Sequence, residues 1–269
     1  EGGIIIGLVE KNDIEILDKK KFGKAGDKII IEEHLVGYEI SYFAFIDKKT
    51  ILPFNYALDH KRANDNDKGL NTGGMGAFTP TKKINKKLNK KIFDEIIIPT
   101  KNGLKKEGIV FRGIIFFGLI ITNSGPKVIE YNVRFGDPEC QVILRNLKSD
   151  LLDILYAVSK DKLKNIKIIN YKQHSICVIL ASKGYPKKYS INYKIQNINK
   201  AKKVKNVEIF HSGTKKVNDN FFSNGGRVLS ISSVGQTIES ARTSAYEALK
   251  ILSWSKGFFR TDIGKKNIK

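Results

Sequence analysis

Apolar residues fall into short blocks or loose alternations along the first two-thirds of the chain. Such blocks, when turn residues bound them, are typical of strands. They predict strands at residues 28–33, 38–46, 51–53 and 111–122, and a hairpin partner at 127–132 after an Asn-Ser-Gly turn. An apolar repeat of every fourth residue, with lysines between, predicts an amphipathic helix through Ile84, Leu88, Ile92 and Ile96. Apolar spacing from Pro138 onward predicts a further helix or helix pair.

The last third of the chain has a βαβ-like pattern. Strands are expected at 175–181, 207–211 and 226–232, before a helix at 237–252 that begins with a threonine suited to N-capping. Before it, the lysine-rich stretch 159–171 has no strong period and predicts a boundary near 165–172. The fold class is therefore expected to be α/β (α+β), divided into residues 1–36, 37–168 and 169–269.

Composition narrows the class of protein. The longest apolar run, Gly113 to Ile121, is far shorter than the roughly 20 residues that a membrane-spanning helix needs. Cys140 and Cys177 form no CxxC pair, and a disulfide scaffold is excluded. With no secretory signal at the start, we expect a cytoplasmic protein without a membrane partner.

The net charge of +21 is typical of nucleic-acid-binding proteins. However, the chain has 41 Lys against 7 Arg, beside 38 Ile and 21 Asn, and all three abundant residues share A/T-rich codons. Arginine, which contacts phosphates and bases in bidentate fashion, is scarce. We therefore expect codon bias and no nucleic-acid partner, and keep a basic nucleic-acid-binding module as the weaker alternative.

The strongest chemical pattern lies between Val128 and Glu139. On a strand, Glu130, Asn132 and Arg134 share one face, and the alternation directs the opposite set, Ile129, Tyr131 and Val133, into the core. A carboxylate, an amide oxygen and a guanidinium on one face suit a magnesium–phosphate site. The alternative is a solvated hairpin face, but the Gly-Asp-Pro turn that follows indicates a shaped loop.

A second pattern combines basic residues with glycines. Asp59-His60-Lys61-Arg62 precedes Asn71-Thr72-Gly73-Gly74-Met75-Gly76. Glycines let the backbone approach a ligand closely, and successive amide groups bind anions, so a phosphate or carboxylate fits here. The alternative is a flexible surface loop.

A third pattern is the segment Glu32 to Glu39, in which a strand ends and turns at Gly37. Its backbone groups could bind a planar base, and the carboxylate of Glu39 could bind ribose hydroxyls. Alone, the segment is more typical of an acidic hairpin end.

Together these segments resemble a known family. The pieces IIIEEHLVGYEIS, ILPFNYALDHKR, LNTGGMGAFTP, KVIEYNVRFGDPECQ, LKSDLL, FHSGT, NGGRVL and RTDIG are similar to phosphoribosylamine–glycine ligase, an ATP-grasp enzyme of purine biosynthesis. The resemblance implies an ATP-grasp large lobe with an antiparallel sheet, a small carboxy-terminal αβ domain, and no amino-terminal domain. It implies ATP and Mg²⁺ or Mn²⁺ as cofactors, and glycine and 5-phosphoribosylamine as substrates.

The resemblance also implies residue roles. Glu130 and Asn132 would hold the metal and Arg134 would be catalytic. Glu32, Leu35 and Glu39 would bind ATP. The substrate-binding residues would be Asp59, Lys61, Arg62, Asn71, Thr72, Gly73, Gly74, Asp137 and Glu139. Leu58 and Leu70 stand where the family usually has Gln and Pro.

The only methionine is Met75, so Glu1 is not a translational start, and the chain is expected to lack a lobe that a separate chain could supply. An inactive ATP-grasp fragment is therefore an alternative to the complete enzyme. His211 is expected to be structural, and Gly225-Gly226-Arg227 is expected near the cleft.

Overall fold

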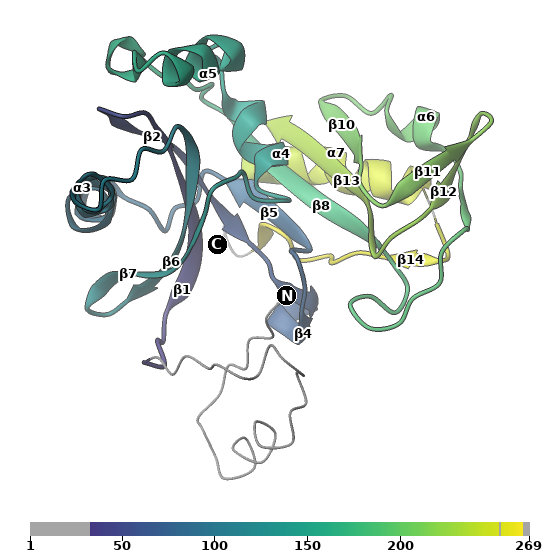
Figure 1. Ribbon diagram of the computed structural model, residues 1–269. Coiled ribbons are helices and arrows are strands. Elements are labelled where there is room, and N and C mark those ends of the chain that lie inside the picture. Colours follow the sequence, from purple (N-terminus) through teal and green to yellow (C-terminus); the bar gives the residue numbers. More distant parts are fainter. Residues whose placement is uncertain (1–32, 253, 266–269) are drawn as a thin grey trace, which may run out of the picture.

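The computed structural model describes residues 33–252 and 254–265. Glu32, the strand expected from residue 28 and the amino-terminal segment 1–7 lie outside those residues. The described chain forms one large antiparallel sheet with helices on both faces (Figure 1).

The sheet is continuous from one end of the molecule to the other. Every neighbouring pair of its strands is antiparallel. In spatial order the strands are β10 (Val207–His211), β13 (Arg227–Gly235), β8 (His174–Ser182), β5 (Gly76–Thr79), β2 (Ile51–Asp59), β1 (Tyr38–Ile46), β6 (Gly113–Thr122) and β7 (Gly125–Asn132), with β14 (Gly257–Phe258) beside β8. The ATP-grasp expectation of an antiparallel sheet is confirmed.

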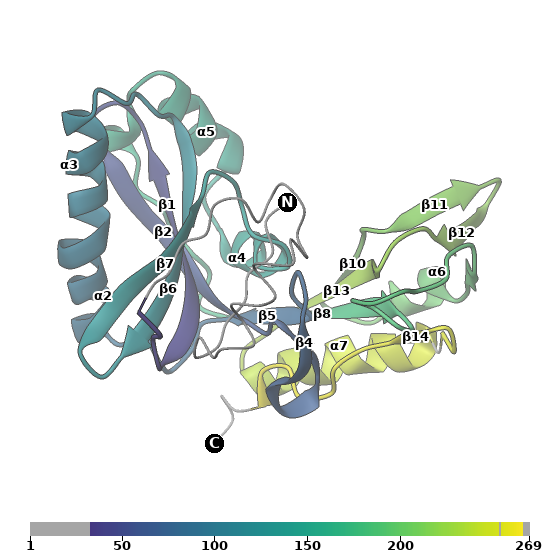
Figure 2. The same cartoon turned by 60° about the horizontal axis from the view of Figure 1, so that its bottom comes forward.

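A long helical segment covers one face of β1, β2, β6 and β7 (Figure 2). It consists of α2 (Lys86–Ile92), the π-helical turn η3 (Phe93–Ile97) and α3 (Ile98–Lys106). Asn85 caps its start by accepting a hydrogen bond from the backbone N–H of Leu88 at 2.9 Å. The expected stripe is confirmed, because Ile84, Ile92 and Ile96 are buried against the sheet and Leu88 packs beside them.

The opposite face is covered by shorter helices and carries a second core. The helices are α4 (Cys140–Ile143), η4 (Leu144–Asn146), α5 (Leu151–Ser159) and η5 (Leu163–Asn165). Their core cluster joins Phe43 and Phe45 of β1 to Cys177 and Ile179 of β8, with Met75 fully buried between them. This core therefore includes residues from both sides of the domain boundary expected near 165–172. The boundary itself stays a prediction.

The carboxy-terminal part differs from the βαβ-like expectation, because β8, β13 and β10 are antiparallel neighbours. The helix α7 (Ile238–Leu252) packs its small apolar stripe, Ala241, Ala245 and Ala248, against this part of the sheet. Shorter elements complete it: β9 (Lys194–Ile195), α6 (Ile198–Ala201), β11 (Thr214–Val217) and β12 (Asn220–Ser223). No described helix is both long and apolar enough for a membrane span.

Between the basic and the glycine-rich parts of the second sequence pattern, the chain forms a hairpin. It is made of β3 (Arg62–Asn64), the turn η2 (Asp65–Asp67) and β4 (Lys68–Asn71). All of β4 is exposed, and Ala63 is the buried residue of β3. Polar exposed faces on both strands explain why no strand pattern was visible in the sequence.

The shared core gives a test of how the two halves fold. We expect Met75→Ala to lower the free energy of unfolding by about 2–5 kcal/mol, because it opens a cavity in a fully buried site. Urea unfolding should still show a single transition. The control is Val36→Ala, at a side chain that is 76% exposed, with an expected change within about 0.5 kcal/mol. Two transitions, of which Met75→Ala moves one, would contradict a shared core.

Candidate active site

A row of small side chains crosses the sheet and leaves room above it. In register, Ser41 of β1 lies opposite Ala57 of β2 and opposite Gly118 of β6, and Gly118 lies opposite Glu130 of β7. Residues directly opposite one another share a face of the sheet. A Cβ at Gly118 would lie 2.7 Å from Cγ of Glu130, so the glutamate side chain lies over this glycine.

The strand β7 carries the two candidate metal ligands on that face. Glu130 and Asn132 are half-buried and lie opposite Gly118 and Phe116 in unbroken register. Their oxygens are the kind that Mg²⁺ takes, and Mg²⁺ usually keeps several waters beside one or two protein ligands. These two residues therefore fit a magnesium ion that is also bound by a phosphate group. In the described residues no group of three His, Cys, Asp or Glu side chains gathers into a metal site.

The opposite face of β7 does not point into the core, and this expectation was wrong. Ile129, Tyr131 and Val133 are 43%, 53% and 69% exposed. The reason is that β7 pairs only with β6 in the described part of the sheet, so its helix-facing side lies at the rim of the helical layer. There the Tyr131 hydroxyl lies 3.1 Å from Oγ1 of Thr100 on α3.

The loop that follows β7 brings further candidates to the site. Arg134 lies beyond the strand end, exposed, and donates from Nη1 to the carbonyl of Phe135 at 2.9 Å. Glu139 is 3% exposed and accepts a hydrogen bond of 2.7 Å from the Ser41 hydroxyl. Ser41 was not among the expected site residues, and its small polar side chain gave no sequence signal.

Charged candidates gather beside the small-residue row. Lys61 Nζ forms an ion pair with Glu39 at 2.8 Å. Burial lowers the pKa of Lys61, but the Glu39 carboxylate and the charges of Asp59 and Glu130 outweigh it and raise the pKa overall. Lys61 therefore interacts electrostatically with the carboxylates of Glu39, Asp59 and Glu130. The ion pair with Lys61 thus occupies Glu39, the carboxylate that the sequence analysis assigned to the ribose of ATP.

Two buried carboxylates carry an electrostatic cost. Burial, and then the charge of Glu139, raise the pKa of Asp59 well above its ordinary value. Burial also raises the pKa of Glu139, against the opposing hydrogen bond from Ser41. Groups tuned in this way are typical of functional sites.

The glycine-rich turn from Thr72 to Gly76 lies directly against the loop after β7. Thr72 donates from its backbone N–H and its hydroxyl to the carbonyl of Lys61, both at 2.8 Å. Gly74 has φ +109°, and a Cβ there would lie 2.5 Å from Pro138 Cδ and 2.9 Å from Asp59 Oδ1. Only glycine tolerates this backbone and this contact.

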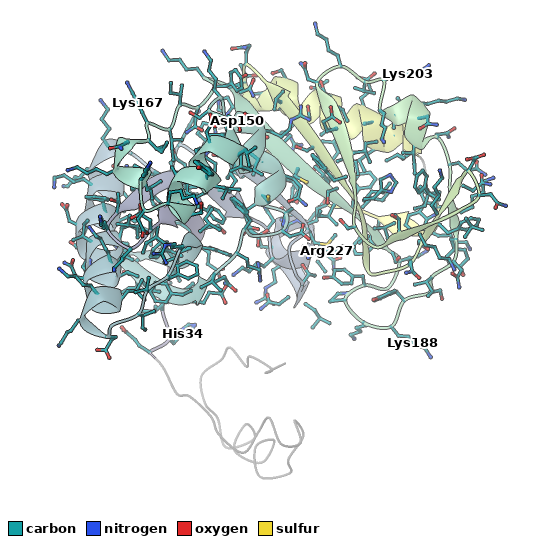
Figure 3. All side chains as sticks on the ribbon, turned by 45° about the horizontal axis from the view of Figure 1, so that its top comes forward. His34, Asp150, Lys167, Lys188, Lys203 and Arg227 are labelled. Atoms are coloured by element: carbon teal, nitrogen blue, oxygen red, sulfur yellow. The ribbon has the colours of Figure 1, made fainter. Side chains whose placement is uncertain are left out.

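Arg227, at the start of β13, joins the two loops. Its Nη1 donates to the carbonyl of Gly73 at 2.7 Å and to the carbonyl of Asp137 at 2.6 Å, and its Nη2 pairs with the Asp137 carboxylate at 3.2 Å. Figure 3 shows Arg227 between the two halves of the molecule. Of the expected Gly225-Gly226-Arg227 segment, these bonds place Arg227 beside Gly73 and Asp137. The hydroxyl of Tyr185, which the sequence analysis missed, accepts from the Gly73 N–H at 3.0 Å.

The remaining candidates lie at the margins. Arg62 and Asn71 lie opposite each other at the base of the β3–β4 hairpin, both exposed, and Arg62 donates to the carbonyl of Gly69. Leu35 is half-buried and lies near the start of the described residues. His211 stacks on Phe221 with ring centroids 4.3 Å apart and contacts Thr214, which agrees with a structural residue.

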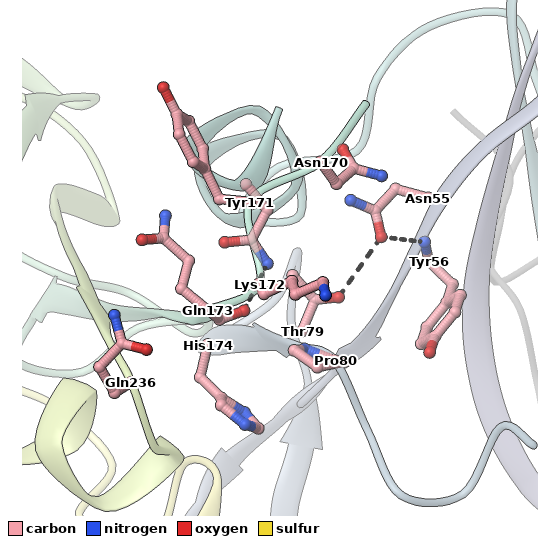
Figure 4. A pocket seen from close by; sticks show the side chains of 11 residues that line it. Asn55, Tyr56, Thr79, Pro80, Asn170, Tyr171, Lys172, Gln173, His174 and Gln236 are labelled. Carbon is pink, nitrogen blue, oxygen red and sulfur yellow. Dashed lines mark hydrogen bonds between the residues drawn. The ribbon is translucent and has the colours of Figure 1, made fainter. Parts of the chain in front are cut away.

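A separate polar cavity of about 320 Å³ lies toward the other end of β2, β5 and β8 (Figure 4). Five carboxamide side chains line it: Asn55, Asn146, Asn170, Gln173 and Gln236. Asn146 Oδ1 and His174 Nδ1 are buried there without a hydrogen-bond partner among the described residues. The cavity contains none of the candidate active-site residues.

Comparison with known proteins first identifies the fold. A biotin carboxylase from Campylobacter jejuni superposes with a TM-score of 0.59 at 14% identity, over 85% of this chain and 48% of that one. Residues 9–140 match the phosphoribosylglycinamide synthetase ATP-grasp (A) domain. The described structure is therefore an ATP-grasp fold.

The family follows from closer matches. Residues 175–266 match the phosphoribosylglycinamide synthetase C domain. The chain is 39% identical over 269 residues to phosphoribosylamine–glycine ligase of Rhodopirellula baltica and 42% identical over 253 residues to that of Caldanaerobacter subterraneus. The crystal structure of the Thermotoga maritima ligase has a TM-score of 0.80 at 30% identity and covers 94% of this chain. The chain belongs to the phosphoribosylamine–glycine ligase family.

The match covers only part of the relatives. The chain spans 62% of the Rhodopirellula ligase, 60% of the Caldanaerobacter ligase and 63% of the Thermotoga crystal structure. From this chain's side the coverage is 98%, 93% and 94%.

The close contact at Gly74 predicts a specific intolerance. We expect Gly74→Ala to lower the free energy of unfolding by about 1–3 kcal/mol, because the methyl group meets Pro138 in a left-handed backbone conformation. The control is Gly103→Ala on α3, where a Cβ meets nothing within 4 Å and a gain of about 0.5–1 kcal/mol is expected. Chemical denaturation measures both. Equal tolerance would contradict the loop contact.

The raised pKa of Glu139 predicts a pH-dependent gain on neutralisation. A raised pKa means that the folded chain binds a proton that the unfolded chain has released, so this group lowers stability as the pH rises above about 4. We expect Glu139→Gln to stabilise the chain relative to wild type more at pH 8 than at pH 5. Thermal unfolding at both pH values measures the difference, with exposed Glu95→Gln as the control. A difference independent of pH would contradict a raised pKa.

Proposed function

We propose that this chain carries the metal-binding and substrate-binding part of a phosphoribosylamine–glycine ligase. In the proposed reaction, glycine's carboxylate oxygen attacks the γ-phosphorus of ATP and gives glycyl phosphate and ADP. The amine of 5-phosphoribosylamine then attacks the acyl carbon, phosphate leaves, and the nitrogen loses a proton, which yields glycinamide ribonucleotide. The observation that carries the proposal is the direct packing of the Thr72–Gly76 turn against the Asp137–Glu139 loop beneath Arg227.

In this proposal the β7 side of the site handles the nucleotide. Glu130 and Asn132 hold Mg²⁺, which when bound neutralises phosphate charge, and Arg134 stabilises the transferring phosphoryl group. A related fold, the biotin carboxylase domain of Hydrogenobacter thermophilus 2-oxoglutarate carboxylase, was solved with MgADP and bicarbonate. That precedent, at 12% identity, supports the fold and a nucleotide site of the same kind.

The glycine-rich side takes the two other substrates. Lys61 supplies positive charge for the phosphate of phosphoribosylamine, and the glycines at 73 and 74 let the ligand approach the backbone closely. Asp137 and Glu139 orient the ammonium group of glycine. Holding the reactants in line accounts for most of the rate, since little covalent chemistry falls to the protein.

Turnover by the isolated chain is expected to be undetectable. Nucleotide affinity in a two-lobed grasp comes from both lobes, and closure excludes the water that would hydrolyse the acyl phosphate. We propose that these contributions come from the part of the family's length that this chain does not span, supplied in the same polypeptide or by a separate chain. The test is to assay glycinamide ribonucleotide formation with and without that part of a related ligase added in trans. Turnover by the chain alone would contradict this proposal.

Metal-dependent nucleotide binding tests the β7 assignment without requiring turnover. We expect weak MgATP binding by the chain, weakened about tenfold or more by Glu130→Gln, because a neutral amide is a poorer magnesium ligand. Calorimetric titration with and without Mg²⁺ measures the effect. Glu95→Gln, an exposed carboxylate on the helical layer, is the matched control. Equal Mg²⁺ dependence in Glu130→Gln and wild type would place the metal elsewhere.

A further inference from the structure

The carboxy-terminal segment carries a buried arginine that the proposed chemistry does not use. Arg260 is 1% exposed, among the largest fully buried side chains of the described residues. Its Nε and Nη2 donate to both carboxylate oxygens of Asp262 at 2.8 Å, and Nη2 also donates to Asp67 Oδ1 at 2.9 Å. Its Nη1 donates to the carbonyl of Arg62 at 3.0 Å. The planar guanidinium therefore joins the end of the chain to the β3–β4 hairpin, nearly 200 residues earlier in the sequence.

The two segments also bind each other reciprocally around this arginine. The Asp65 carboxylate accepts from the backbone N–H and the hydroxyl of Thr261, while the Asp262 carboxylate accepts from the backbone N–H of Asn66 at 2.8 Å. Asn66 and Asp67 have φ of 59° and 55°, a left-handed conformation that non-glycine residues adopt only when their surroundings hold them. The hydrogen bonds of residues 260–262 supply those surroundings.

In the described part of the chain, the hairpin itself buries little apolar surface. Ala63 is its buried apolar residue, and all of β4 is exposed. Two-stranded hairpins are at best marginally stable without packing. Its position therefore depends on the polar contacts with residues 260–262, which we call the arginine clamp.

The base of this hairpin is the substrate side of the proposed site. Lys61 directly precedes β3, and its carbonyl accepts from both the backbone N–H and the hydroxyl of Thr72, just after β4. Thr72 Oγ1 in turn accepts from the N–H of Gly74 at 3.0 Å. A shift of the hairpin therefore moves the lysine and the glycine amides together.

We infer that Arg260 is a positioning residue: its clamp on the β3–β4 hairpin sets the place of Lys61 and the Thr72–Gly74 turn for a sugar-phosphate substrate. The identity of the ligand in this inference rests on the proposed function, whereas the contacts of the clamp do not. Arg260 is buried behind the hairpin and does not touch substrate. Lysine cannot replace it, because a single ammonium group does not offer the forked donors that reach three partners at once.

Hydrogen exchange on the 269-residue chain without ligand tests the clamp itself. We expect Arg260→Met to speed exchange of the amides of residues 61–74 about tenfold or more, while amides of β6 exchange as in wild type. Arg260→Lys should give an intermediate effect. Should Arg260→Met fail to fold, Asp67→Asn removes one partner at a half-exposed carboxylate and should speed the same amides. Unchanged exchange of residues 61–74 in the folded variants would overturn the clamp.

Binding of ribose 5-phosphate, a stable analogue of the sugar phosphate, tests the link to the site. We expect Arg260→Met and Asp67→Asn to weaken it about tenfold, with little change in Mg²⁺-dependent ATP binding. The matched control is Arg112→Met, which removes an arginine that pairs with Asp161 through two hydrogen bonds elsewhere on the molecule. Faster exchange with undiminished ribose 5-phosphate affinity would overturn the positioning role. No binding by wild type would instead contradict the proposed function, and the exchange result would still decide the clamp.

Discussion

The short strand β5 is the constraint on which this architecture depends. Ala77 and Phe78 pair with β2 on one side, and all four residues pair with β8 on the other, which makes one sheet from two halves of the molecule. The approach is close, since a Cβ on Gly76 would lie 2.6 Å from the carbonyl oxygen of Cys177. Because the glycine-rich turn leads directly into β5, the same backbone that joins the halves also fixes the turn against the loop after β7.

The ionised carboxylates beside β5 lower the stability of the fold. Asp59 and Glu139 are both held in surroundings that disfavour their ionised forms, and Lys61 offsets this only in part. The nearby His60 is also buried, and burial together with the charge of Arg260 lowers its pKa to about 4. The surroundings therefore disfavour the charged forms of Asp59, His60 and Glu139, and groups perturbed in this way are typical of functional sites.

The sequence predicted those elements whose pattern is local. The strand from Tyr38 to Ile46 is found as expected because its apolar run is buried on both faces. Ile92 and Ile96 are found on a helix as expected because one buried face imposes a period on the residues, although Ile84 lies just before the helix begins. The βαβ-like pattern failed because strand order and direction depend on which distant strands pair. Strand β5 was missed because four residues beginning with glycine carry no period.

The sequence predicted which segments form the candidate site. It did not predict which residues of those segments contact one another. Motif resemblance named Asp59, Lys61 and Glu139, and the structure brings them into electrostatic contact with one another. It did not indicate a role for Ser41 or Arg260, because each acts through a partner far along the chain. One clue was present in the composition: in a chain with 41 lysines and only 7 arginines, Arg227 and Arg260 each contact several partners through a forked guanidinium.

The exposed face of β7 has a consequence for how this protein behaves at high concentration. Within the described sheet, the outer edge of β7 presents unpaired backbone groups beside Ile129, Tyr131 and Val133, all well exposed. Such an edge is a template on which a second chain can add a strand. Lys127 and Arg134 flank the segment with positive charge, and two identical edges would bring these charges together. Self-association through this edge should therefore be held back by electrostatic repulsion and promoted by salt, which screens it.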